Sequence, residues 1–246
     1  MLSSDYGILL LVAMPVVAFL YASVGHGGAS SYLMFLTLAG FIPDQVRPTA
    51  LLLNIAVSLI AFISYNKVTT FPHRIFWPLV AFSIPAAYLG GTISIDPNIY
   101  KRILGVLLLL PVLRFLNVFP KSQVLKISPS IAIIALIGLG IGLLSGLIGI
   151  GGGIILSPLI LMLGWADMKV TATLSSIFIF VNSIAGLTGS ATGNLMISND
   201  LWLILGVTII GGIFGAFFGA QRFKVKTVEY LLTTVLLIAS VKLIWT

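Results

Sequence analysis

Two glycine clusters at corresponding positions in the two halves of the chain are the strongest candidates for chemistry. The first reads Gly25-His-Gly-Gly, and the second reads Gly149-Ile-Gly-Gly-Gly. Each cluster interrupts an apolar stretch and is followed by a short apolar segment. Adding 124 to a residue number in the first cluster gives its counterpart in the second, which indicates a duplicated device. The same offset pairs Gly40 with Gly164 and Thr49 with Thr173.

A helix broken inside a bilayer exposes backbone N–H groups that lipid cannot satisfy, so the break must face protein or water. The segments after the clusters begin with unpaired donors and the partial positive charge of a helix amino terminus, which favour an anion. Serine hydroxyls in their first turns add donors. We therefore expect an anion site between two opposed breaks. Its predicted residues are Gly25, Gly27, Gly28, Ser30, Ser31, Gly149, Gly151, Gly152, Gly153 and Ser157.

Other glycines are predicted to serve helix packing alone, because small residues let membrane helices approach closely. They are spaced one to four residues apart in two later apolar stretches. The two sets are Gly138, Gly140, Gly142 and Gly146, and Gly211, Gly212, Gly215 and Gly219.

His26 is the histidine that falls within a predicted membrane segment, since His73 lies in a connection. It has two interpretations, which the sequence leaves open. The imidazole could donate to an anion or carry a proton, or it could simply bond the backbone at the break. The second cluster has Ile150 at this place, so any function of His26 is asymmetric.

Polar residues on the long segment after each short one complete the candidate site. Thr49 and Thr173 are in register, whereas Asn54 and Asn182 correspond only loosely. An unpaired amide is costly in apolar surroundings, so each asparagine either bridges helices or lines the site. Bridging is favoured for Asn182 and is undecided for Asn54. Arg47 could attract an anion from outside, although an arginine snorkelling at a helix end is the commoner case.

Acidic residues are informative through their positions. All six lie at termini, connections or segment ends, and there is no cysteine. This argues against a carboxylate proton relay, a metal or carboxylate sodium site, thiol chemistry and an intramembrane aspartyl protease. We expect no cofactor, no metal and no enzymatic activity. A serine hydrolase built from His26 with Ser30 or Ser31 is a distant alternative, because serines are common at helix starts.

Composition places the chain in a membrane. Of its 246 residues, 59% are hydrophobic and 8% are charged, and the mean hydropathy is +1.18. Apolar runs of about 18 residues or more recur along the chain, which predicts an all-α polytopic bundle. The formal net charge of +7 comes mostly from residues in short connections, so it reports membrane topology and not a nucleic acid partner.

Each half divides into five helical segments. In the first half they cover residues 7–24, 30–39, 46–65, 75–93 and 100–116, with the short second segment directly after the break. In the second half the first segment runs from 130 to the break and the second from the break to 163. The other three cover 170–190, 201–220 and 228–245. We therefore predict a first repeat over 1–116, a cytoplasmic linker over 117–129 and a second, inverted repeat over 130–246.

Basic residues predict the orientation of these segments. Arg222, Lys224 and Lys226 mark their connection as cytoplasmic, whereas residues 189–200 lack lysine and arginine and are predicted to be external. Counting back places both termini outside. The connection with Lys67 and Arg74 and the linker with Lys121 and Lys126 agree, and Lys101 with Arg102 disagrees. The inversion requires an odd number of crossings per half: five, or three if the broken segments form re-entrant hairpins. Paired interruptions in inverted repeats favour a secondary transporter with a midplane site.

These motifs resemble the TauE/SafE family, also called the 4-toluene sulfonate uptake permease family. The second-half stretch reads Gly142-Leu-Leu-Ser-Gly-Leu-Ile-Gly-Ile-Gly-Gly-Gly-Ile-Ile-Leu-Ser-Pro158 and is similar to the family signature. The first-half stretch Ser23-Val-Gly-His-Gly-Gly-Ala-Ser30, with Arg47-Pro-Thr-Ala50 and Asn54, resembles a variant found in some members. The likeness covers essentially the full length.

The resemblance implies a secondary transporter of small sulfur-containing anions such as sulfite or organosulfonates. Such proteins usually export their substrate across the cytoplasmic (inner) membrane of a prokaryote. An anion channel, or an uptake permease for another small anion, is the alternative. The expected partners are the anion, the lipid bilayer and a second copy in a homodimer, which the glycines over 211–219 would serve as well as an internal contact.

Overall fold

The computed structural model describes residues 7–115, 129–190, 199–221 and 237. Within these residues the chain is helical and contains no strand. The helices are α1 (Gly7–Ala22), α2 (Ala29–Leu38), α3 (Pro43–Asn66), α4 (His73–Thr92), α5 (Pro97–Phe115), α6 (Ile131–Ile148), α7 (Gly153–Met162), α8 (Met168–Ser190) and α9 (Asn199–Gln221). The all-α prediction is confirmed. The predicted segment over 228–245 and most of the linker lie outside the described residues.

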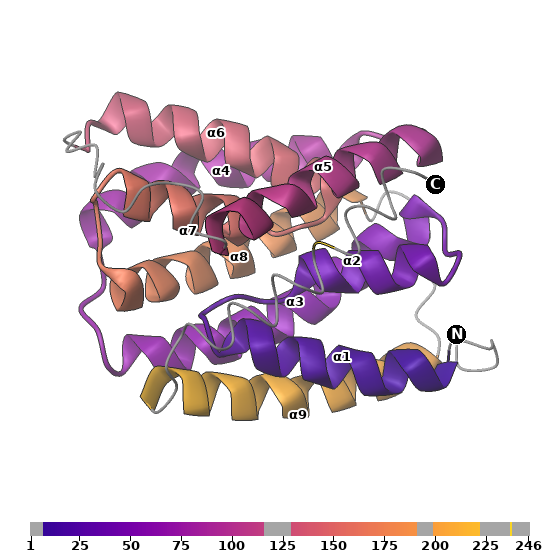
Figure 1. Ribbon diagram of the computed structural model, residues 1–246. Coiled ribbons are helices and arrows are strands. Elements are labelled where there is room, and N and C mark those ends of the chain that lie inside the picture. Colours follow the sequence, from indigo (N-terminus) through magenta and orange to yellow (C-terminus); the bar gives the residue numbers. More distant parts are fainter. Residues whose placement is uncertain (1–6, 116–128, 191–198, 222–236, 238–246) are drawn as a thin grey trace.

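Five of these helices, α3, α4, α6, α8 and α9, are long and apolar enough to cross a membrane. The helices that follow the breaks are shorter: α2 and α7 have 10 residues each. In Figure 1 the chain reverses direction at both breaks, so α2 runs opposite to α1 and α7 runs opposite to α6. The two hairpins start from opposite ends of the bundle, α1 at the right and α6 at the left. The division into repeats at 117–129 stays a prediction.

The breaks repeat in backbone conformation as well as in sequence. Gly28 and Gly152, which the offset of 124 pairs, are the N-caps of α2 and α7 and have φ of +100° and +78°. L side chains rarely adopt such a φ, so glycine is the residue that allows the chain to turn here. The paired positions Gly25 and Gly149, and Gly40 and Gly164, also have positive φ. The spacing of glycines therefore encodes the two turns.

Helices of the two halves interleave. One apolar core lies between α1, α2, α3, α5 and α9 and includes residues around the second break, and the other lies between α4, α6, α7 and α8. Each long helix packs mainly on the other half: α4 lies against α6 and α8, and α9 lies against α1 and α3. Because α3 also packs along α8, these two helices form the centre of the bundle and carry residues from one half to the other.

Two glycine rows allow the closest of these approaches. A Cβ atom on Gly138, Gly142 or Gly146 would overlap a backbone carbonyl of α4, and one on Gly211, Gly215 or Gly219 would overlap a backbone carbonyl of α1. The packing prediction is thus confirmed for these six residues. Gly140 is an exception because open space surrounds it. The row on α9 is occupied by α1, so it serves an internal contact.

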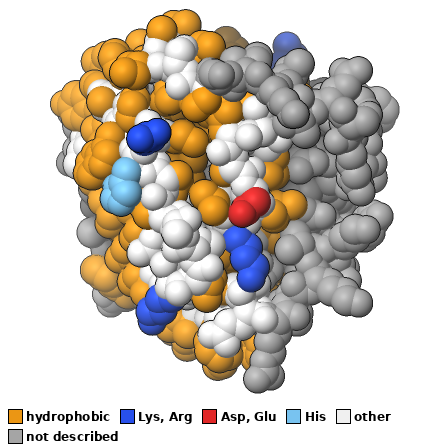
Figure 2. Space-filling view, turned by 90° about the vertical axis from the view of Figure 1, so that its left-hand side faces the viewer, with side chains coloured by type: hydrophobic (Ala, Val, Ile, Leu, Met, Phe, Trp, Pro, Cys, Tyr) orange, Lys and Arg blue, Asp and Glu red, His pale blue; other side chains and the backbone are white. Residues whose placement is uncertain are grey.

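Charged side chains gather at one end of the bundle. Lys67 and Arg74 flank the α3–α4 connection, and Asp167 and Lys169 flank the start of α8, all of them exposed. Figure 2 shows basic, acidic and histidine side chains on the face that forms the left end in Figure 1, with hydrophobic side chains among them. A hydrogen bond of 2.7 Å between the hydroxyls of Thr69 and Thr173 joins the two segments. This is the end that the positive-inside pattern predicts to be cytoplasmic.

Candidate functional site

The two breaks converge on the side chain of Asn54, which α3 holds in the centre of the bundle. Asn54 is 1% exposed. Its Oδ1 accepts from the backbone N–H of Ala29 at 3.2 Å, at the start of α2, and its Nδ2 donates to Ser183 Oγ on α8 at 3.0 Å. A Cβ on Gly27 or on Gly151 would overlap this amide. Glycine at both positions therefore lets each break press against the same asparagine.

A second polar connection joins the first break to the second half of the chain. His26 Nδ1 lies 3.0 Å from the carbonyl oxygen of Val24, and its Nε2 lies 2.9 Å from Ser157 Oγ on α7. Ser157 Oγ in turn lies 2.7 Å from Ser175 Oγ on α8. Of the two interpretations of His26, the bond to the backbone is present. The contact with Ser157 extends it into a chain across the two halves.

The hydroxyls of Ser30 and Ser31 face a tyrosine. Tyr21 Oη lies 2.7 Å from Ser30 Oγ and accepts from Ser31 Oγ at 3.1 Å. All three side chains are buried. Sequence reasoning missed Tyr21, although a hydroxyl-bearing residue one turn before the glycine break was a usable signal. In the second half the offset of 124 places Ser145 there, and its buried Oγ has no partner.

Replacing Tyr21 by phenylalanine is expected to lower the free energy of unfolding by about 1–3 kcal/mol, because two buried serine hydroxyls lose their partner. Thermal unfolding of the detergent-purified protein measures this effect. Tyr88→Phe is the matched control, since Tyr88 is 45% exposed on the outer surface. Equal stability of the two variants would show that the Tyr21 hydroxyl contributes nothing.

A small cavity lies where these groups meet. Its volume is about 10 Å³, close to the space that one water molecule needs. Gly27 and Gly28 line it, and among the described residues their N–H groups have no backbone acceptor. The N–H groups of Gly151, Gly152 and Gly153 at the second break also have no backbone acceptor, but these glycines are not part of the cavity lining. The cavity is lined by Tyr21, His26, Gly27, Gly28, Ala29, Ser30, Asn54, Ile150, Ile154 and Ile179.

Arg47 lies beside the second break and is 4% exposed, so the expectation that it snorkels is wrong. The helix starts at Pro43 and not at residue 46, which places Arg47 more than a turn inside α3. Its guanidinium donates to four carbonyl oxygens, three at the end of α4 and one on α6. These are Ile93 at 2.9 Å, Gly91 and Gly146 at 3.0 Å, and Gly90 at 3.3 Å.

Three other predicted residues lie apart from this centre or act within one helix. Thr173 bonds Thr69 and the Lys169 carbonyl near the charged end, so it is not brought to the breaks. Thr49 is buried on α3. Asn182 donates to the Phe178 carbonyl of its own helix at 2.8 Å, and its buried Oδ1 has no partner. The expected bridging by Asn182 is therefore wrong. Asn54 and Ser183 form the bridge instead.

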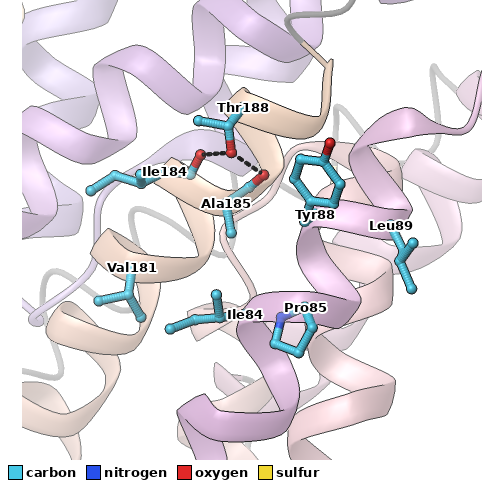
Figure 3. A pocket seen from close by; sticks show the side chains of 8 residues that line it. All are labelled: Ile84, Pro85, Tyr88, Leu89, Val181, Ile184, Ala185 and Thr188. Carbon is cyan, nitrogen blue, oxygen red and sulfur yellow. Dashed lines mark hydrogen bonds between the residues drawn. The ribbon is translucent and has the colours of Figure 1, made fainter.

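A larger hollow of about 660 Å³ lies on the outer surface between α4 and α8. Figure 3 shows that aliphatic side chains line most of it, and that the Thr188 hydroxyl is directed to its own helix, where it donates to the carbonyls of Ile184 and Ala185. This groove offers no free polar group from threonine and suits an apolar neighbour. The candidate site is therefore at the breaks. The groove is lined by Ile84, Pro85, Tyr88, Leu89, Val181, Ile184, Ala185 and Thr188.

Comparisons with known proteins relate the chain to membrane transporters. The family described as "Sulfite exporter TauE/SafE" matches residues 9–243. The probable membrane transporter protein y4hK of Sinorhizobium fredii is 32% identical over 96% of this chain and 97% of its own length. The probable membrane transporter protein YunE of Bacillus subtilis is 26% identical over the same shares. MJ0441 of Methanocaldococcus jannaschii, also a probable membrane transporter protein, is 26% identical over 76% of this chain and 73% of its own. No solved structure matches the chain significantly.

Proposed function

Because the chain belongs to the sulfite exporter TauE/SafE family, we propose that it exports small sulfur-containing anions, such as sulfite or organosulfonates, across the cytoplasmic membrane. The observation that carries the proposal is the meeting of the two breaks at Asn54, with the N–H groups of Gly27 and Gly28, which have no backbone acceptor, beside one small cavity. Oriented N–H donors at helix starts bind anions without a cationic side chain. The second break brings Ile150 and Ile154 to the same cavity.

The size of the cavity favours alternating access over an open channel. A space for one water cannot hold a sulfonate, so the substrate must enter after the walls separate. The walls come from both halves, with α2 and α3 on one side and α7 and α8 on the other. Movement of one half against the other would open the cavity, as in transporters built from repeated units. The 10-residue lengths of α2 and α7 are too short for a full crossing, which favours the re-entrant arrangement with three crossings per half.

The orientation with both termini external and the homodimer remain part of this proposal. The α9 glycines contact α1, so a dimer would use another surface. The channel is the second candidate function. Flux into proteoliposomes that rises in proportion to anion concentration, without saturation, would favour the channel.

Substitution of Asn54 by aspartate tests the anion site more cleanly than a change of glycine. A side chain on Gly151 or Gly152 meets packed neighbours, so it would disturb the fold as well as the site. Aspartate keeps the shape of Asn54 and still accepts from Ala29, but it replaces the amide donor by a negative charge that repels an anion. We expect Asn54→Asp to lose anion binding while the protein remains folded.

Thermal stabilisation of the purified protein by a panel of anions measures this binding. A ligand that binds only the folded state stabilises it by roughly 2.7 kcal/mol at a hundred times its dissociation constant. We expect a selective shift with sulfite or a sulfonate, compared with sulfate, acetate and chloride, that is absent in Asn54→Asp. Asn66→Asp is the matched control, because Asn66 is exposed at the end of the same helix. An equal shift in Asn54→Asp would place the anion elsewhere, and no shift with any anion in the native protein would contradict the substrate class.

A further inference from the structure

His26 occupies a position with an unusual set of neighbours. It stands where the second break has Ile150, and it lines the cavity. Its neighbours are Tyr21 from α1, Asn54 from α3, Ser157 from α7 and Ser175 beyond it on α8. Among the residues that line the cavity, none is Asp, Glu, Lys or Arg. The Tyr21 hydroxyl is engaged with Ser30 and Ser31, so the imidazole is the group that can change charge there.

The hydrogen-bond partners of the His26 ring are compatible with both the neutral and the protonated imidazole, and no heavy atom has to move between the two states. A carbonyl only accepts, so the bond to Val24 puts a proton on Nδ1 in both states. In the neutral ring, Nε2 accepts from the Ser157 hydroxyl, which accepts from Ser175. In the charged ring, Nε2–H donates to Ser157, whose hydroxyl then turns toward Ser175. Reversal of the two hydroxyls is the only change that a proton on His26 requires.

Charge links this proton to the anion. The cavity is apolar apart from its donors, so an anion there would be stabilised by a positive imidazolium beside the N–H groups of Gly27 and Gly28. By thermodynamic reciprocity, a bound anion must raise the affinity of His26 for a proton as much as the proton raises the affinity for the anion. The two together form a neutral pair, which is less costly to hold in the membrane interior than either ion alone.

We propose that His26 is a proton-binding site and that each anion crosses the membrane together with a proton held on Nε2. This inference rests on the proposed anion transport. The chain also provides a release mechanism, because His26 belongs to the first half and Ser157 and Ser175 belong to the second. Separation of the halves breaks the Nε2–Ser157 contact and exposes the proton and the anion to water on the same side.

Proteoliposomes of phosphatidylethanolamine and phosphatidylglycerol, with the full-length protein and a pH dye inside, test the coupling. The substrate is isethionate, whose sulfonate stays ionised, so that any accompanying proton must be carried by the protein. Efflux of labelled isethionate down its gradient is expected to make the lumen alkaline, with about one proton leaving per anion. A lumen whose pH does not respond while isethionate leaves would overturn the inference and keep the proposed transport. Sulfite is tested as a second substrate. If neither isethionate nor sulfite shows a flux that depends on the protein, both the proton coupling and the proposed anion transport are overturned.

The variant His26→Gln assigns the proton to this residue. Glutamine can bond Ser157 but cannot gain a charge, so proton movement is expected to fall to the level of protein-free vesicles even where isethionate still exchanges. His73→Gln is the matched control, because His73 is exposed in the α3–α4 region at the charged end, and it should keep native coupling. Native proton movement per anion in His26→Gln would overturn the assignment. If His26→Gln fails to fold, the number of protons that leave per anion is compared between the native protein and Ser157→Ala, which removes the partner of Nε2. An equal number in the two proteins would also overturn the assignment to His26.

Discussion

Replacing Arg47 by methionine is expected to lower the free energy of unfolding by about 3–5 kcal/mol, the cost of breaking a buried charged network. The guanidinium donates to the carbonyl oxygens of Gly90, Gly91 and Ile93 at the end of α4. The last carbonyls of a helix lack intrahelical partners, and here only Gly90 also accepts from the backbone N–H of Ile93. It also donates to Gly146 on α6. Methionine fills a similar volume but removes this donor from the buried Gly91 and Gly146 carbonyls, whereas Gly90 keeps the N–H of Ile93.

Among the described residues, no carboxylate forms a hydrogen bond with Arg47, so its positive charge is stabilised by carbonyl oxygens. The carbonyls at the carboxyl ends of α4 and α6 carry partial negative charge, which favours a cation at this point. Tyr100 on α5 complements the arrangement by donating to the Ile148 carbonyl at 2.9 Å, next to the second break. Arg47 and Tyr100 together satisfy carbonyls that the break in α6 leaves without partners, so we interpret Arg47 as a residue that holds the break in shape.

Thermal unfolding in detergent should show the Arg47→Met variant melting roughly 10 °C below the native protein, given the usual relation between free energy and Tm at this chain length. Arg47→Lys keeps the charge but has a single ammonium group for four acceptors spread over two helices, so an intermediate Tm is expected. Arg74→Met, at an exposed position in the first turn of α4, should melt with the native protein. A native Tm for Arg47→Met would refute the stabilising function of Arg47.

Sequence patterns predicted the helical class, the broken helices and the paired turns, because each depends on local chemistry. Apolar runs define the long helices, and glycine clusters define where φ becomes positive. The pairing of Gly25 with Gly149 and of Gly28 with Gly152 is visible in the sequence and recurs in the backbone. A prediction of this kind needs only the residues within one segment, so it does not depend on how the helices pack.

The partners of the polar side chains could not be predicted in the same way. Asn182 and Ser183 are adjacent, but neighbours on a helix point about 100° apart, and only the packing of α3 on α8 decides that Ser183 meets Asn54. Arg47 was misplaced for a related reason. A start of α3 at residue 46 would leave it at the mouth, whereas Pro43, which suits the first turn of a helix, starts α3 earlier and carries Arg47 into the protein.

Gly146→Ala should destabilise the protein, whereas Gly140→Ala should not, although the two glycines lie six residues apart on α6. A Cβ on Gly146 would overlap the carbonyl oxygen of Ala87 and lie 2.7 Å from the backbone nitrogen of Gly91. Backbone atoms of a packed helix cannot yield as a side chain can, so the loss should reach the upper end of the roughly 1–3 kcal/mol typical of overpacking. At Gly140 nothing lies within 4 Å, and alanine favours a helix interior by roughly 0.5–1 kcal/mol over glycine.

The same pair of substitutions on α9 provides an independent replicate, because Gly215 presses on the carbonyl of Phe19 whereas Gly206 has open space around it. Thermal unfolding of all four alanine variants measures the difference, and similar Tm values within each pair would contradict the packing.

The α6 pair carries a further consequence. Arg47 binds the carbonyl of Gly146, so a shift of α6 away from α4 also loosens the arginine that holds the second break. Gly146→Ala should therefore impair anion binding along with stability, and Gly215→Ala, whose row presses on α1, tests the equivalent contact at the first break.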